Sequence, residues 1–184
     1  KGQLAMQAQD IIQFWFSELS NKQRFAKDPE LDAAMRERFG PTLQAAISGD
    51  LASWRTSATG RLAEIVVLDQ FSRNMFRGLP QSFAQDHLAL SLAQELVANR
   101  EDLQLTAGQQ SFAYMPYMHS EVLSIHQQAV QLFSRPGLED ELVFELRHKA
   151  IIDRFGRFPH RNLILDRMST PEEEAFLKQP GSSF

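Results

Sequence analysis

Three short stretches of this sequence carry residue types that can bind an anion or move a proton. The first holds Asp69 and Arg73 one helical turn apart, followed by Asn74 and Arg77. Periodicity places Asp69 and Arg73 on an apolar helix face, where a carboxylate and a guanidinium must pair to tolerate burial. The simpler interpretation is an ion pair that locks this helix to a neighbour. The alternative is a ligand anchor, to which Asn74 and Arg77 add hydrogen-bond donors.

The second stretch contains His119, Glu121 and His126. The two histidines are seven residues apart on a helix predicted to follow Pro116, so they lie near one stripe but about 10 Å apart along the axis. That separation is too large for one metal ion, and we expect no metal site. A histidine on an apolar face is more often a hydrogen-bonded core residue than a ligand. Glu121 is rotated away from His119 on an ideal helix, which weakens an acid–base pair between them.

The third stretch is a loop rich in positive charge near the C-terminus. Pro159 disfavours helix at the residue before it and removes a backbone donor, so the segment after Gly156 is predicted to be irregular. It presents Arg157, His160, Arg161 and Asn162. Arginines in a loop suit bidentate recognition of a carboxylate or phosphate. Pairing with the acidic runs 139–141 or 172–174 explains the same residues equally well, and both interpretations stay open.

Composition predicts the elements that must position these side chains. Leu, Ala and Gln supply 22, 19 and 17 of the 184 residues, whereas Val, Ile and Thr supply 6, 8 and 5. This bias favours helices over strands. The length fits one domain covering residues 1–184. Short connectors between the predicted helices favour stacked helical hairpins, and we expect seven to eight helices in an all-α fold.

Helix boundaries follow from turn signals and apolar spacing. An N-terminal helix whose apolar stripe begins at Leu4 is expected to end at Asn21-Lys22, and the next helix to stop at Gly40-Pro41. The segment from Leu62 to Phe76 is apolar on nearly all sides, which predicts a central helix. Pro116 is expected to break or kink a later helix.

Net charge and composition narrow the classes of partner. A formal charge of −4 argues against nucleic acid and anionic membranes, which both attract basic surfaces. The longest aliphatic run is Ile65 to Leu68, too short for a membrane span. No signal peptide is recognisable, so we expect a cytoplasmic protein. The chain lacks cysteine and the common nucleotide-binding and hydrolase motifs, and we expect no cofactor. The sequence is compatible with a homo-oligomer.

Three ordered motifs resemble a bacterial family designated domain of unknown function 924. They are Arg61–Glu64 running into Leu68–Gly78, then Tyr114–Glu121, then Arg154–Asn162 continuing through Ser169–Glu173. The likeness covers nearly the whole chain and implies a one-domain, tetratricopeptide-like α-α superhelix without an established reaction. Its motif positions here are Asp69, Gln70, Arg73, Asn74, His119, Glu121, Arg157, His160, Arg161 and Asn162. Ser72 stands where the family pattern has Pro, and Asp166 where it has Gly.

Two functional hypotheses follow from these residues. In the first, a helical binding module holds a small anionic ligand or a partner's peptide through Arg73, Arg157 and Arg161. In the second, an enzyme acts on a phosphorylated or carboxylated metabolite, with His119 or His160 as general acid or base and Glu121 orienting it. The second hypothesis requires the two histidines and Glu121 to meet in one solvent-reachable pocket.

Overall fold

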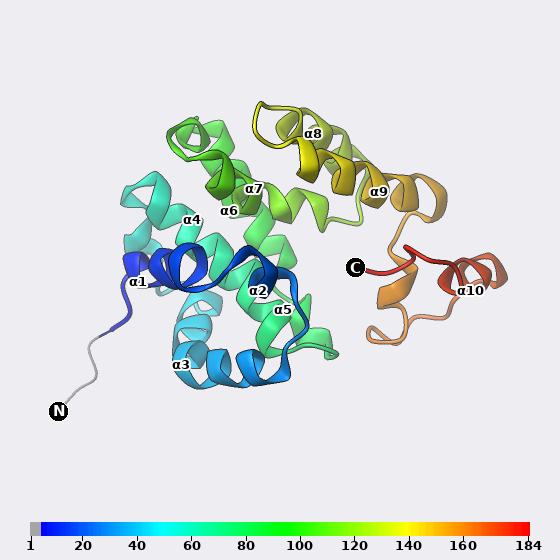
Figure 1. The fold of residues 1–184 in the computed structure, drawn as a ribbon, viewed down its shortest axis with the longest axis horizontal. Coiled ribbons are helices and arrows are strands. Elements are labelled where there is room, and N and C mark those ends of the chain that lie inside the picture. The colour runs from blue at the N-terminus through cyan, green and yellow to red at the C-terminus, as the bar shows by residue number, and fades with distance from the viewer. Residues whose placement is uncertain (1–4) are drawn as a thin grey trace.

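The structure is a computed structural model that describes residues 5–184, and this part of the chain contains helices and turns but no strand. Residues 1–4, including Leu4 of the predicted N-terminal stripe, lie outside the described part. The predicted all-α class is confirmed (Figure 1). The α-helices are α1 (Ala8–Gln13), α2 (Asn21–Phe25), α3 (Pro29–Ile47), α4 (Ala58–Val66), α5 (Ser72–Met75), α6 (Asp86–Ala98), α7 (Ala107–Met118), α8 (Leu123–Phe133), α9 (Glu139–Phe155) and α10 (Pro171–Leu177).

Short helices of other types complete the secondary structure. Two of them are π-helical turns, η1 (Phe14–Glu18) and η3 (Val67–Phe71). The others are 3₁₀ turns, namely η2 (Ala52–Thr56), η4 (Pro80–Ser82), η5 (Glu101–Gln104) and η6 (Pro159–Arg161). A π-helical turn accommodates one extra residue, often near functional positions. Because η3 carries Asp69, the first predicted site residue lies on such a turn.

The predicted central helix is confirmed, but as three joined pieces. α4, η3 and α5 follow one another without a break, and α1, α3, α6 and α7 pack around them. Every residue from Leu62 to Ser72 is buried. This all-round burial explains why the segment is apolar on nearly all sides, and it encloses the polar side chains in the same segment.

Aromatic side chains fill the core between the N-terminal helices and this central segment. Trp15, Phe39 and Phe71 are fully buried, and the ring of Phe71 lies 5.0 Å from that of Phe39 and 5.8 Å from that of Trp15. A second, smaller cluster contains Ile151, Ile152 and Phe158. The chain therefore has a large apolar core and a minor one, and the minor one joins α9 to the loop that follows it.

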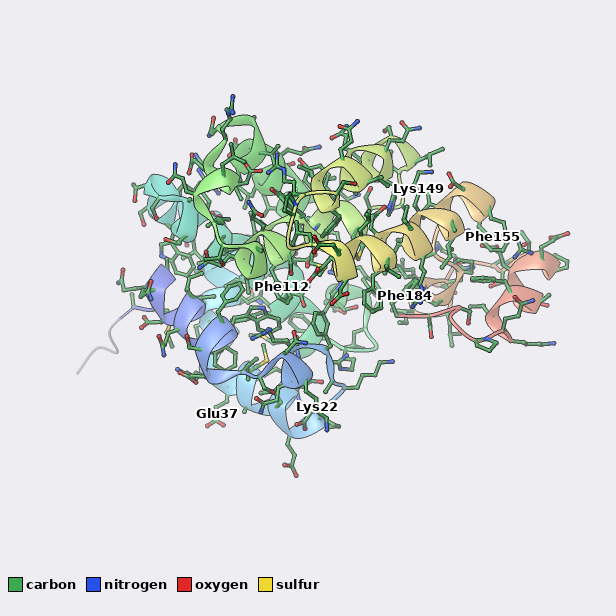
Figure 2. All side chains as sticks on the ribbon, turned by 45° about the horizontal axis from the view of Figure 1, so that its top comes forward. Lys22, Glu37, Phe112, Lys149, Phe155 and Phe184 are labelled. Carbon is green, nitrogen blue, oxygen red and sulfur yellow. The ribbon has the colours of Figure 1, made fainter. Side chains whose placement is uncertain are left out.

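The C-terminal segment returns to the rest of the molecule after α9. Helices α6 to α9 pack on one another in chain order, and Gly156 ends α9 in a left-handed conformation with φ of 70°. Figure 1 shows α10 at one end of the molecule and the last residues running back from it toward the middle. There Phe184, labelled in Figure 2, stacks on His148 of α9 with ring centroids 3.6 Å apart.

Two predicted helix ends in the N-terminal half are wrong. The first helical stretch ends at Glu18, and Asn21 begins α2 because Ser20 and Gln23 form a capping box there. α3 continues through Gly40-Pro41 to Ile47. Gly40 has no Cβ to meet the proline ring, and buried residues on either side keep the helix packed on the core.

Of the two outcomes expected at Pro116, a break is wrong, and a kink stays a prediction. α7 contains Pro116 and ends two residues later at Met118, with His119 as its C-cap. Residues 119–122 then form a turn before α8, so His119 and His126 belong to different elements rather than to one helix. None of the helices in residues 5–184 is long and apolar enough to cross a membrane.

Candidate functional site

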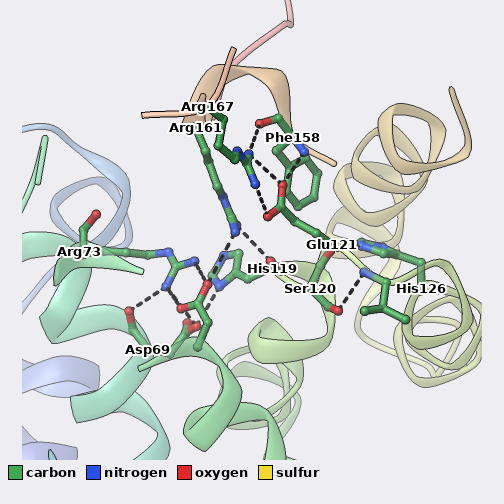
Figure 3. A network of polar contacts seen from close by, with 12 residues as sticks. Asp69, Arg73, His119, Ser120, Glu121, His126, Phe158, Arg161 and Arg167 are labelled. Carbon is green, nitrogen blue, oxygen red and sulfur yellow. Dashed lines mark hydrogen bonds and ion pairs between the residues drawn. The ribbon is translucent and has the colours of Figure 1, made fainter. Parts of the chain in front are cut away.

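Side chains from three segments that are far apart in the sequence meet in one polar network, as Figure 3 shows. The segments are the η3–α5 region, the turn that follows α7, and the loop that follows α9. Asp69 contacts His119, and Arg161 contacts the backbone of His119. His119 therefore joins the first and third segments, and these are the same stretches that the sequence singled out.

Asp69 is a buried carboxylate with a full set of partners. It accepts hydrogen bonds from Gln70 at 2.8 Å and from Arg73 at 3.2 Å, and its Oδ1 lies 2.8 Å from His119 Nδ1. Burial alone would raise the pKa of Asp69, but the nearby His119 and Arg73 and these hydrogen bonds lower it to about 2. Asp69 is therefore ionised at neutral pH, and the predicted i, i+4 pair with Arg73 is confirmed.

His119 is held in one orientation and one protonation pattern. Its pKa is lowered from 6.5 by burial and by the positive charge of Arg73, so the ring is neutral at neutral pH. Because Asp69 can only accept a hydrogen bond, Nδ1 carries the proton and Nε2 carries the lone pair. Within residues 5–184 Nε2 has no hydrogen-bond partner, and it is not among the fully buried atoms that lack one, so solvent reaches it.

Arg73 is neutralised by two carboxylates. Besides Asp69 it donates two hydrogen bonds to Asp86, at 2.7 and 3.0 Å. Asp86 begins α6, and the sequence analysis did not select it. The only sequence signal was an acidic residue at a helix start, which ordinary helices also show. Arg73 consequently has little capacity left to bind an external anion.

Arg161 is buried but only partly compensated. It donates to the carbonyl oxygen of His119 at 2.9 Å, and its distance to Asp86 is a long 3.6 Å. Its guanidinium carbon lies 4.5 Å from the ring centroid of Phe83 and 4.8 Å from that of Phe158, while Nε is buried and has no partner in the described residues. Burial and the charge of Arg73 lower the pKa of Arg161 to about 10.

Glu121 does not have the role proposed from the sequence. It accepts hydrogen bonds from the amide of Phe158 at 2.7 Å and from Arg167 at 2.8 and 3.1 Å, and no histidine of the described residues donates to it. The turn after α7 directs its side chain toward the C-terminal loop. The carboxylate that orients His119 is Asp69 instead, and Glu121 with Arg167 fixes the loop that carries Arg161.

The predicted ligand residues Asn74 and Arg77 belong to a separate cluster. Asn74 donates to Asp32 at 3.0 Å, and Arg77 donates to the same carboxylate at 2.8 and 3.2 Å. These bonds tie the end of α5 to α3. Asp32 accounts for both donors, which is the structural interpretation of these positions.

Arg157 and Asn162 also pair within the C-terminal segment. Arg157 donates to Glu173 at 2.7 and 2.9 Å, as the alternative interpretation of the loop predicted. Asn162 contacts Ser169 and Arg167, both at 3.0 Å. Arg157 lines a shallow hollow of about 570 Å³ together with Arg154 and Glu173, and neither Asp69 nor His119 lines it.

His160 lies in the same C-terminal loop as Arg161 but has other neighbours than His119. Its ring is 5.8 Å from the rings of both Phe158 and Phe184, and Nδ1 is buried without a partner in the described residues. Burial and the charge of Arg161 lower its pKa to about 4. His160 makes no hydrogen bond to His119 or Glu121, so these three residues do not form the acid–base group that the enzyme hypothesis required.

A fully buried pair supports the turn that carries His119. His126 Nδ1 lies 2.8 Å from Glu145, and His126 Nε2 lies 2.6 Å from the carbonyl oxygen of Ser120. A carbonyl only accepts hydrogen bonds, so Nε2 donates. His126 thus fixes the backbone next to His119. Within residues 5–184, no group of three His, Asp or Glu side chains is placed to hold a metal ion.

Comparisons with known proteins agree with the motif resemblance. The family model described as bacterial protein of unknown function (DUF924) matches residues 11–181. The chain belongs to this family. Its fold is similar to that of a protein of unknown function from Agrobacterium tumefaciens, with a TM-score of 0.85 and 36% sequence identity over 93% of this chain and 96% of the other. No curated protein matches the chain.

Proposed function

We propose that this member of the DUF924 family binds a small molecule through a carboxylate or phosphate group at Arg161. The observation that carries this proposal is the incomplete compensation of a buried guanidinium. Arg161 has one carbonyl partner, one long contact to a carboxylate already shared with Arg73, and an unpartnered Nε. A buried cation in this condition favours an anion, because removal from water is costly without a close counter-charge.

The neighbouring groups are consistent with a small ligand. Phe83 and Phe158 flank the guanidinium and hold it in place, which lowers the entropy lost when an anion binds. His119 Nε2 adds a hydrogen-bond acceptor that solvent reaches. In this proposal Arg73 makes no direct contact with the ligand, because Asp69 and Asp86 occupy it. Arg157 has no part in it, because Glu173 occupies that guanidinium.

Thermal denaturation with added anions tests the proposal. Glutarate and inorganic phosphate are the probes, and a ligand at 100 times its Kd stabilises the native state by about 2.7 kcal/mol. We expect at least one probe to raise the Tm of the parent protein and to have no effect on Arg161→Gln. Arg38→Gln is the matched control, since it removes an exposed arginine paired with Glu18, and it should keep the shift.

Two results would contradict anion binding at Arg161. One is the absence of a shift with either probe, and the other is an equal shift in the parent and in Arg161→Gln. Circular dichroism establishes that the variant is folded. If Arg161→Gln does not fold, Arg161→Lys retains the charge but loses the planar fork, and it is expected to weaken the shift.

A further inference from the structure

The His119–Asp69 pair has the geometry of a base held ready by a carboxylate. The Nδ1–Oδ1 distance is 2.8 Å, and Asp69 is held in turn by Gln70 and Arg73. Nε2 makes no hydrogen bond within residues 5–184, although solvent reaches it. A carboxylate on one ring nitrogen fixes the tautomer, so the other nitrogen can accept a proton.

The immediate surroundings of His119 indicate what supplies that proton. Among the described residues, Asp69 is the only side chain hydrogen-bonded to the imidazole, and no serine or threonine hydroxyl lies within hydrogen-bond distance of Nε2. A covalent nucleophile activated by His119 is therefore absent from the described part of the chain. The side chain of His119 is 14% exposed, so water is the group that we assign as the proton donor to Nε2.

Arg161 supplies a positive charge at a defined position relative to this base. Its guanidinium donates a hydrogen bond to the carbonyl oxygen of His119 at 2.9 Å. The cation is therefore attached to the backbone of the same residue whose side chain is the base. A largely desolvated guanidinium stabilises negative charge better than an exposed one does. A substrate whose anionic group contacts Arg161 would thus be held close to His119, and correct placement is a large part of catalysis.

We propose that His119 is a catalytic general base that activates water to hydrolyse a carboxylic ester whose free carboxylate is bound by Arg161. This inference rests on the proposed function. Water gives a proton to Nε2 while its oxygen bonds to the ester carbonyl carbon, and the π electrons of the carbonyl move onto its oxygen to give a tetrahedral oxyanion. The C=O bond then re-forms as the bond from that carbon to the alcohol oxygen breaks, and Nε2 returns the proton to the departing alcohol. The products are an acid and an alcohol, and no other reactant is consumed.

Asp69 is a positioning residue in this scheme. It stays ionised throughout, keeps the proton on Nδ1 and stabilises the imidazolium that forms transiently. Its effect is measurable as a change in pH dependence. Asp69→Asn removes the negative charge beside the ring, which makes the imidazolium less stable. The midpoint of the pH–rate profile is therefore expected to move to lower pH in that variant.

The experiment compares three chromogenic substrates with the full chain. They are the mono-para-nitrophenyl ester of glutaric acid, the neutral para-nitrophenyl butyrate, and para-nitrophenyl phosphate. We expect hydrolysis above the buffer rate for the glutarate ester, a lower kcat/KM for the neutral ester because it lacks the carboxylate, and none for the phosphate. Faster hydrolysis of the phosphate than of the glutarate ester would overturn the assignment to carboxylic esters.

Variants of two histidines separate catalysis from folding. In His119→Asn the amide nitrogen replaces the Nδ1 donor to Asp69 but the base is lost, so the rate should fall by about 10²-fold to 10⁴-fold. His87→Asn, at an exposed position of α6, is the control and should retain the parent rate. If His119→Asn is unfolded, the parent itself decides the question. Its rate must fall as the pH drops through a midpoint below 6.5, and a flat profile overturns the inference.

Binding and hydrolysis can fail separately. If glutarate raises the Tm through Arg161 but its ester is not hydrolysed, the catalytic inference is wrong and the binding function stands. If glutarate and phosphate both fail to bind and the ester is not hydrolysed, both proposals are wrong. Equal hydrolysis by the parent and by folded His119→Asn shows that the activity does not come from this base.

Discussion

The N-terminal helices and the C-terminal loop are held to the molecule by different forces. The N-terminal helices contact the central segment through tilted and edge-on aromatic rings, among them Trp15, Phe39 and Phe71. The C-terminal loop after α9 has only a small apolar cluster and is attached by Arg161 and Arg167 through hydrogen bonds. Burial of aromatic surface is nondirectional, whereas hydrogen-bonded ion pairs require specific geometry. The first kind of contact provides stability, and the second places functional groups.

The largest expected effect comes from the aromatic side of this comparison. Phe71→Ala leaves a cavity in the main core and should lower the free energy of unfolding by about 3–5 kcal/mol. Phe25→Ala is the control, because Phe25 is 60% exposed. Urea denaturation followed by circular dichroism measures both. If the two variants lose the same stability, the aromatic core is not what holds the N-terminal helices.

A smaller and more local effect is expected from Glu121→Gln. The amide keeps one acceptor for the amide of Phe158 but loses the charge that binds Arg167, at a cost of about 1–3 kcal/mol. Hydrogen exchange should accelerate in the loop 157–167 and remain unchanged in α4. Glu18→Gln is the matched control, since Glu18 pairs with Arg38 on the surface. Accelerated exchange throughout the chain would contradict a locally attached loop.

Acidification should lower the free energy of unfolding through two buried histidines, His148 of α9 and His160 of the C-terminal loop. Burial lowers the pKa of His148 to about 3, and burial with the charge of Arg161 lowers that of His160 to about 4. Below pH 6.5 these two histidines therefore take up protons in the unfolded chain but not in the native state. The free energy of unfolding falls as the pH drops from 6.5 toward 4. The decrease is at most about 1.4 kcal/mol per pH unit for each histidine.

The measurement is a series of urea denaturation curves across that pH range. His148→Leu should flatten the dependence because it removes one of the two buried bases. Its ring contact with Phe184 is lost at the same time, so the slope with pH is informative and the absolute stability is not. A parent protein whose stability does not change between pH 6.5 and 4 would show that these histidines are protonated in the native state.

Local signals in the sequence predicted the parts of the site that depend on neighbours along the chain. The Asp69–Arg73 pair follows from helical spacing. Asp166 replaces the Gly of the family pattern, and its φ of 53° is the left-handed conformation that glycine adopts without strain. Asp69 and Arg73 are within a few residues of each other.

Other parts of the site depend on packing between distant segments. The partner of His119 is 50 residues away and that of Glu121 is 46 residues away, so no spacing rule could identify them. Asp86 was missed because its role appears only when α6 lies beside α5. Pro41 shows the same limit in the fold, because core packing keeps a helix intact through a residue that usually ends one.

The π-helical turn at Val67–Phe71 has a consequence for the register of the central segment. One extra residue in a helix rotates everything that follows by about 100° relative to an uninterrupted α-helix. Converting this turn to regular α-helical geometry with its five residues kept would turn either the apolar side of α4 or the polar end of α5 away from its present neighbours, whereas deleting one residue would restore that geometry and leave both facing as they do now. The extra residue of this turn is thus what allows the apolar side of α4 and the polar end of α5 to face their present neighbours within one continuous helical segment.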